Sequence, residues 1–209
     1  MKTLLTLILA AAVLFSAATA SADLMTYEGT DLTRTVKVHA AGYNIDGRTV
    51  YAGRYRLGYR GEDIYGYCVD IDQWAGDSEV TLDDTDFLNN GDLAAWLFET
   101  YAAAADTNVL AAGLGVAIWE VLYENTEPYS PYSGDFHISR NDNVADAAQT
   151  YLTGLPQSHT PEESTVVLRS QNKQDMMVCC ETVVPEPASL MILAVGGLGL
   201  LLRRRHATG

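Results

Sequence analysis

The chain has 209 residues, with 13 lysines and arginines against 27 aspartates and glutamates, and a formal net charge of −14 at pH 7. This acidic balance repels the phosphate backbone of nucleic acids and anionic lipid surfaces, so nucleic-acid-binding proteins are excluded. The three cysteines are an odd number, which leaves at least one of them without a disulfide partner if the other two pair.

The first 22 residues have the features of a secretory signal peptide, in the usual order. Lys2 precedes an apolar run from Leu4 to Phe15, and small residues follow up to Ala22. Together these features direct export and removal of the segment by signal peptidase. Cleavage after Ala22 fits best, with a site two residues earlier as the close alternative. We therefore expect residues 1–22 to be removed and the rest to work outside the cytoplasm.

The next part of the chain alternates with the two-residue period of β-strands. Residues 35–39 alternate, residues 51–60 do so more clearly, and a third strand is expected over residues 64–71. The second strand has an apolar face and an arginine face, made by Tyr55, Leu57 and Tyr59 and by Arg54, Arg56 and Arg60. The third strand places Cys68 and Asp70 on the face opposite Tyr67. The arginine and aspartate faces are then in position to pair across the hairpin.

The centre of the chain has the 3.6-residue spacing of helices. One helix is expected after the start signal at residues 89–92, a second has an apolar stripe over 110–122, and a third runs from 141 to 154. Strand spacing returns at 164–170 and 176–178. The sequence predicts a single α+β domain over residues 23–183, an antiparallel sandwich or barrel-like sheet with an inserted helical region.

The end of the chain, residues 184–209, has a second ordered set of features. The motif Val184, Pro185, Glu186, Pro187 precedes an apolar segment over 188–202 and the basic cluster Arg203, Arg204, Arg205. A helix over that segment would rise about 22 Å, short of the roughly 30 Å hydrocarbon core, but bilayer thinning and snorkelling arginines accommodate such a transmembrane helix. The basic cluster favours a cytoplasmic end, which places the preceding domain across the membrane.

This tail resembles the PEP-CTERM sorting signal, with its motif, short hydrophobic helix and terminal basic cluster in the same order. In that family an exosortase, an integral membrane transpeptidase-like enzyme, recognises the tail and processes the protein near the motif. The resemblance implies exosortase and signal peptidase as partners, and a membrane-held precursor that ends in the envelope, at the surface or outside the cell. It also implies a bacterial host with a biofilm or extracellular polymer system. An ordinary membrane anchor is the alternative.

Residues 48–155 resemble the thioester domain of bacterial surface adhesins. The segments that carry the resemblance are Tyr67-Cys68-Val69-Asp70 and Ala117-Ile118-Trp119-Glu120, with support from 50–53 and 94–97. In that family a cysteine attacks a glutamine carboxamide, ammonia leaves, and the thioester captures amines on a target surface. Cys68 matches the family cysteine, but Gly115 stands where the family has its glutamine, four residues before the tryptophan.

Gly115 has no carboxamide, so the thioester of the family cannot form with it. We therefore predict a non-enzymatic surface or matrix protein with a structural or adhesive role, whose partners include extracellular polysaccharide or other surface proteins. A covalent adhesin remains open, in which another glutamine replaces the missing acyl partner of Cys68. A hydrolase that uses Cys68 is the third possibility. The glutamines available are Gln73, Gln149, Gln171 and Gln174.

No cofactor or metal is predicted. The acidic run at residues 83–86 lacks the glycine and glutamate of an EF-hand and is expected to be a solvated turn, and the histidines lack zinc-binding spacing. Cys68 is expected to be a small, partly buried core residue, and Trp96 and Trp119 to be core anchors. A glycine inside a helix costs about 1 kcal/mol relative to alanine. Gly115→Ala is therefore expected to stabilise unless another element packs against position 115.

Overall fold

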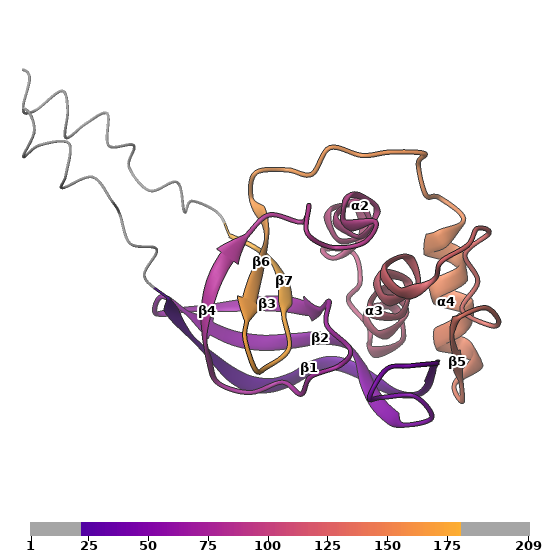
Figure 1. Cartoon of the computed structure of the whole chain (residues 1–209), viewed down its shortest axis with the longest axis horizontal. Coiled ribbons are helices and arrows are strands. Elements are labelled where there is room, and N and C mark those ends of the chain that lie inside the picture. Colours follow the sequence, from indigo (N-terminus) through magenta and orange to yellow (C-terminus); the bar gives the residue numbers. More distant parts are fainter. Residues whose placement is uncertain (1–21, 181–209) are drawn as a thin grey trace, which may run out of the picture. The chain divides into compact units, whose positions relative to one another are not determined.

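Strands come first and last, with the helices between them, in residues 22–180, the part of the chain that the computed structural model describes (Figure 1). The elements are β1 (Asp23–Ala40), β2 (Thr49–Tyr59), β3 (Glu62–Cys68), β4 (Ser78–Asp83), α2 (Gly91–Tyr101), α3 (Asn108–Tyr123), β5 (Phe136–Ser139), α4 (Asp142–Leu152), β6 (Thr165–Ser170) and β7 (Met176–Cys179). The expected signal peptide and sorting tail lie outside this part. None of the helices within it is long and apolar enough to cross a bilayer.

The strands pair only in antiparallel fashion, and six of them close into a ring. The sheet order is β2-β3-β7-β6-β4-β1-β5, and an additional pairing between β1 and β2 closes the ring of six, with β5 outside it. The 18-residue β1 makes closure possible, because it pairs with β4 at residues 23–25, with β2 along 25–37 and with β5 at 37–40. Two register shifts in its pairing with β2 allow it to bend. The expected α+β class with a barrel-like antiparallel sheet is confirmed.

The two faces of β2 are as the alternation predicts, but the partners of its arginines are not. Tyr55, Leu57 and Tyr59 are buried. The arginines form ion pairs with acids of β1: Arg54 with Asp31 at 2.7 Å, Arg56 with Glu28 at 3.7 Å, and Arg60 with Asp23 at 2.5 Å.

The expected pairing of these arginines with the aspartates of the third strand is wrong because β3 ends at Cys68, before the aspartates. The carboxylates of Asp70 and Asp72 instead accept hydrogen bonds from backbone N–H groups, of Asp72 and of Asn44 respectively, at 2.8 Å each. Both acids thus hold the loop that follows β3 and form no ion pairs with the arginines of β2.

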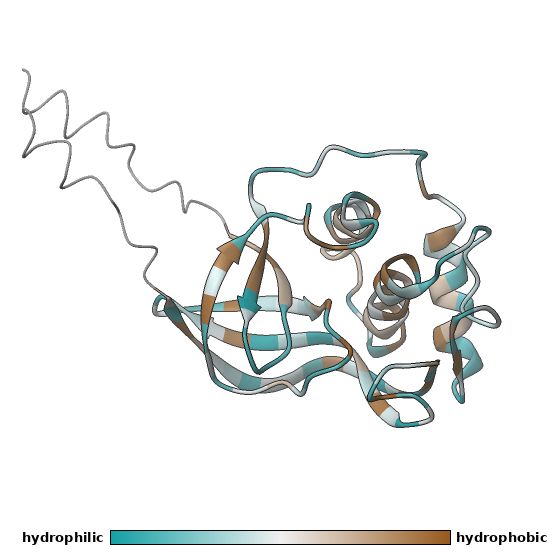
Figure 2. Cartoon of the chain, in the orientation of Figure 1, coloured by the Kyte–Doolittle hydropathy of each residue, from teal (hydrophilic) through white to brown (hydrophobic). Residues whose placement is uncertain are grey.

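Helix α3 is the centre of the helical layer. Every residue from Ala111 to Leu122 is buried. The helix contacts β1 and β2 on one side and α2, α4 and β5 on others, so it is shielded all round (Figure 1). Outside it, α4 carries both hydrophilic and hydrophobic residues, and hydropathy changes from residue to residue along the strands (Figure 2). The fully buried helix is therefore the element on which barrel and outer helices are assembled.

Polar side chains satisfy the ends of α3. Thr107 caps its start, because the hydroxyl oxygen accepts a hydrogen bond from the N–H of Leu110 at 3.2 Å. At the other end, the amides of Asn89 and Asn90 donate to the carbonyl oxygens of Leu122 and Val121, at 3.3 and 2.8 Å. These carbonyls have no partner inside the helix, so the asparagines before α2 also anchor α2 to α3.

Candidate functional site

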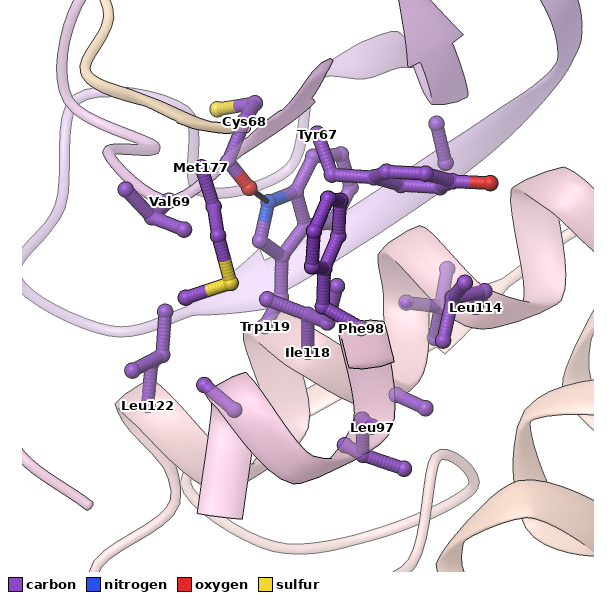
Figure 3. Packing of buried hydrophobic residues seen from close by; sticks show 14 of the residues in the cluster. Tyr67, Cys68, Val69, Leu97, Phe98, Leu114, Ile118, Trp119, Leu122 and Met177 are labelled. Carbon is purple, nitrogen blue, oxygen red and sulfur yellow. Dashed lines mark hydrogen bonds between the residues drawn. The ribbon is translucent and has the colours of Figure 1, made fainter. Parts of the chain in front are cut away.

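Cys68, on which the covalent and enzymatic interpretations depend, is buried at the end of β3 and only 1% exposed. Its thiol donates to the carbonyl oxygen of Asp70 at 3.0 Å. Its own carbonyl oxygen accepts a hydrogen bond from the indole Nε1 of Trp119 at 2.9 Å, and its sulfur points away from α3 (Figure 3). The residue is therefore more deeply buried than the sequence suggested.

Burial is also the main influence on the chemistry of this thiol. It raises the pKa of Cys68 far above the usual value of a cysteine, and the charge of Asp70 adds to the rise. The nucleophile in cysteine chemistry is the thiolate, which a dry environment disfavours. Burial therefore favours the protonated thiol over the thiolate at Cys68, and the residue packs beside Trp119.

Gly115 lies against the backbone of β2 and not against the Cys68 sulfur. A Cβ atom built at position 115 would lie 2.9 Å from the backbone nitrogen of Gly53 and 3.7 Å from a ring carbon of Tyr67. Tyr67 and Cys68 are consecutive in β3, so their side chains point to opposite faces. The two residues that match the reacting pair of the thioester family are therefore on different sides of the strand.

Gly53 completes this close approach from the barrel side. Its φ of +129° favours glycine, and a Cβ there would overlap the carbonyl oxygen of Leu32 and lie 3.3 Å from the backbone nitrogen of Ala112. With glycine on both elements, α3 and β2 pack backbone to backbone. Position 115 is therefore not an open helical site, and the condition under which Gly115→Ala would stabilise the protein is not met.

The structure brings together two of the histidines that the sequence keeps apart. His39 of β1 and His137 of β5 are register partners, with rings stacked at 4.7 Å between centroids. His159 lies elsewhere, against Glu99 at 2.5 Å. Over residues 22–180, no group of three or more His, Cys, Asp or Glu side chains is arranged to hold a metal ion.

The acidic run after β4 forms local and cross-strand contacts. The N–H of Asp86 donates to the carboxylate of Asp84 at 3.0 Å, as in a turn, and Asp83 forms an ion pair with Arg169 of β6 at 3.2 Å. These contacts agree with a solvated turn at the barrel surface.

Two buried glutamates at the end of α3 form a site that sequence reasoning missed. Glu120 accepts a hydrogen bond from the N–H of Ser130 at 2.6 Å, and its second carboxyl oxygen has no partner among the described residues. Glu124 accepts from the N–H groups of Asn125, Thr126 and Phe136. Burial raises the pKa of Glu120 to about 8, with Glu124 adding to the rise. Acids at i and i+4 in an apolar helix were the available signal; both organise the loop between α3 and β5.

A small aromatic pocket, also missed by the sequence, is lined by strands β1 and β2, by helix α3 and by three connecting loops. It has a volume of about 160 Å³, a buried floor that includes Trp119, and a rim that includes Tyr51 and Trp74. We call it the aromatic pocket. A larger hollow of about 790 Å³ runs along β4 and the β6–β7 turn, but it is mainly polar and is bordered by Ala22, where the described chain begins.

The comparisons with known proteins bear on the tail alone. The family profile of the PEP-CTERM protein-sorting motif matches residues 183–205, which include the proline motif, the apolar segment and the basic cluster. The match indicates an exported protein whose membrane-held precursor is processed by exosortase. No curated protein and no solved structure gives a significant match to the chain. The resemblance of residues 48–155 to the thioester domain therefore has no support from a relative or a structure.

Proposed function

We propose that this chain is a non-enzymatic structural or adhesive protein of the cell surface or extracellular matrix, delivered there by exosortase. The observation that carries the proposal is the sorting motif at residues 183–205, which implies an exported precursor processed by exosortase. The burial of Cys68 supports a role without covalent chemistry, because it raises the pKa of the thiol and so disfavours the nucleophilic thiolate.

Deleting residues 185–209 in the native host tests delivery. The shortened protein is expected to lose its surface location and to be found free in the periplasm or medium, because neither the membrane-inserting segment nor the recognition motif is present. Replacing Arg203, Arg204 and Arg205 with lysine is the matched control, since it keeps the positive charge that orients the segment. Unchanged location and unchanged mature size after the deletion would remove the basis of the proposal.

The intact mass of the exported protein separates this function from a covalent adhesin. A thioester carries a deficit of one ammonia and takes up methylamine, whereas we expect neither. Cys179 is exposed and serves as an internal control for thiol labelling: iodoacetamide should modify it in the folded protein and should reach Cys68 only after unfolding. Methylamine uptake by the wild-type protein would mean that Cys68 has found another acyl partner.

A further inference from the structure

We propose that the aromatic pocket binds a neutral pyranose unit of an extracellular polysaccharide. Tyr51 and Trp74 would stack on the sugar ring, and the amides of Gln73 and Gln174 would hydrogen-bond its hydroxyls. The inference deepens the proposed function by naming what the surface protein holds. The inference rests on the proposed function in one respect: export is what brings the pocket into contact with extracellular polysaccharides.

The pocket has a dry floor and an exposed aromatic rim. Its floor is formed by buried side chains from three separate segments, Ile45, Ile71 and Trp119. At the rim, Tyr51 is 56% exposed and Trp74 is 58% exposed. Large aromatic side chains that remain this exposed contribute little to stability through burial. Their position at the mouth of a pocket therefore indicates a ligand.

The loop that carries Gln73 and Trp74 is fastened along its length. The N–H of Ile71 donates to the hydroxyl of Tyr123 at 3.2 Å, and the N–H of Gln174 donates to the carbonyl of Trp74 at 3.3 Å. Beyond Trp74, Asp77 accepts from the N–H of Tyr27 at 2.8 Å. Such attachments hold the rim in place before any ligand arrives, which reduces the entropy lost on binding.

The two aromatic rim residues are supported individually. The guanidinium of Arg48 lies 5.9 Å from the centroid of the Trp74 ring. The hydroxyl of Tyr55 donates to the backbone carbonyl of Tyr51 at 2.7 Å, which ties the second rim residue to the buried face of β2. The Trp74 ring and the backbone that carries Tyr51 are therefore held in place before a ligand binds.

The chemistry of the lining matches a neutral sugar. A pyranose has apolar C–H faces, which pack on aromatic rings, and a rim of hydroxyls, for which glutamine amides supply both donors and acceptors. No charged side chain lines the aromatic pocket. Residues 23–184 carry nine basic and 26 acidic side chains, a net charge of −17 that repels anionic polymers.

The size of the pocket selects a single ring. Pockets that enclose drug-sized ligands have volumes of roughly 300–1,000 Å³, whereas this one has about 160 Å³. One sugar unit can enter while the rest of the polymer passes over the surface. Affinity for one site is then modest, and repeated units along the polymer compensate through multivalency.

Electrophoresis of the exported protein through gels that contain a dissolved polysaccharide tests the proposal. The probes are dextran, laminarin and galactomannan as neutral polymers, and alginate as an anionic one. We expect at least one neutral polymer to retard the wild-type protein, and alginate not to. Trp74→Ala should weaken the retardation about tenfold or more, while Trp74→Phe should keep part of it.

Tyr65→Ala is the matched control, because Tyr65 is another exposed aromatic residue with an arginine over its ring, yet it lies outside the pocket. The neutral polymers should retard the Tyr65→Ala variant as much as they retard the wild-type protein. The proposal is overturned if none of the neutral polymers retards the protein, if only alginate does, or if Trp74→Ala and Tyr65→Ala behave alike. Each of these results leaves sorting by the tail intact, so it is distinguished from a failure of the proposed function.

Discussion

The segment that leaves β3 passes within six residues from Cys68, which is 1% exposed, to Trp74, which is 58% exposed. Cys68 has the reactive side chain, but burial raises its pKa and leaves it only 1% exposed. Trp74 has no reactive group, but it stands at the mouth of a pocket. Trp119 joins the two regions, since its indole N–H binds the Cys68 carbonyl and its ring forms part of the pocket floor. The exposure of a side chain therefore decides whether it can contact a ligand. Residue type alone would have pointed to Cys68 and not to Trp74.

This division between a packed side and an open side can be tested by substitution. Changes on the packed side, where α3 meets the barrel, should reduce stability. Changes at the rim of the aromatic pocket should leave stability nearly untouched and affect only binding.

Of the three test positions Gly115, Glu120 and Trp74, the largest effect is expected at Gly115, because a side chain there meets backbone atoms of Gly53 that cannot turn aside. Gly115→Ala gains about 1 kcal/mol of helix propensity but introduces an overlap that costs about 1–3 kcal/mol, so a net loss is expected. Gly115→Gln should lose about 3 kcal/mol or more and should not form a thioester with Cys68. Urea unfolding of the exported protein measures both changes.

Gly76→Ala is the control for this comparison. The three atoms nearest to a Cβ at Gly76 all belong to the side chain of Lys173, the closest at 3.2 Å, and that flexible chain can move aside. Its stability should therefore stay close to that of the wild type. If Gly115→Ala proved more stable than the wild type, α3 and β2 would not be in backbone contact.

An intermediate effect is expected at Glu120, and it depends on pH. The native state keeps a proton on this carboxyl up to about pH 8, whereas the unfolded chain releases it near its ordinary pKa of 4.5. Between these values the native state binds more protons than the unfolded state, so the free energy of unfolding falls as pH rises. Glu120→Gln removes this dependence and should stabilise the protein at pH 8 by on the order of 1–3 kcal/mol.

The pH dependence is measured by urea unfolding of both proteins between pH 5 and pH 9. Glu163→Gln, at an exposed position, is the control and should leave the slope of the wild type unchanged. A wild-type stability that did not fall over this range would show that Glu120 is ionised in the native state. The neighbouring Glu124 is kept in every variant, because its carboxylate organises the following loop.

The smallest effect on stability is expected at Trp74. Because more than half of its side chain is already in water, Trp74→Ala should change the free energy of unfolding by about 0.5 kcal/mol or less. Trp119→Ala provides the contrast, since removing a buried tryptophan costs about 3–5 kcal/mol. Thermal unfolding compares the two variants. A similar cost at both positions would make Trp74 a packing residue and would erase the distinction between the two sides.

The sequence predicted the helices well because their signals are local. The apolar stripe over 110–122 became α3, Asn108–Tyr123, and the start signal at 89–92 became the beginning of α2. Of β1 only residues 35–39 were recognised, because bulges and polar residues interrupt the alternation of the rest. The short strands β4 and β5 were missed, since distant partners and not their own sequence stabilise them.

The candidate site was predictable only in part, for a similar reason. Cys68 could be noticed from its type and neighbours, but its burial depends on Met176 of β7, paired with it from the other end of the chain. The lining of the aromatic pocket comes from β1, the β1–β2 loop, β2, the loop after β3, α3 and the β6–β7 turn. These segments are far apart in the sequence and come together only in the closed barrel. No local sequence pattern could therefore have predicted the pocket.

The order of strands around the ring has a consequence for how the chain folds during secretion. β6 and β7, the last strands to cross the membrane, lie between β3 and β4, which cross much earlier. Until residues 165–179 emerge, the inner faces of the earlier strands stay open to solvent, and closure requires contacts between distant parts of the chain, which form slowly. The sorting motif, matched at residues 183–205, comes after these strands in the chain. A pause in translocation at that motif would hold the chain beside the membrane while its last two strands complete the barrel.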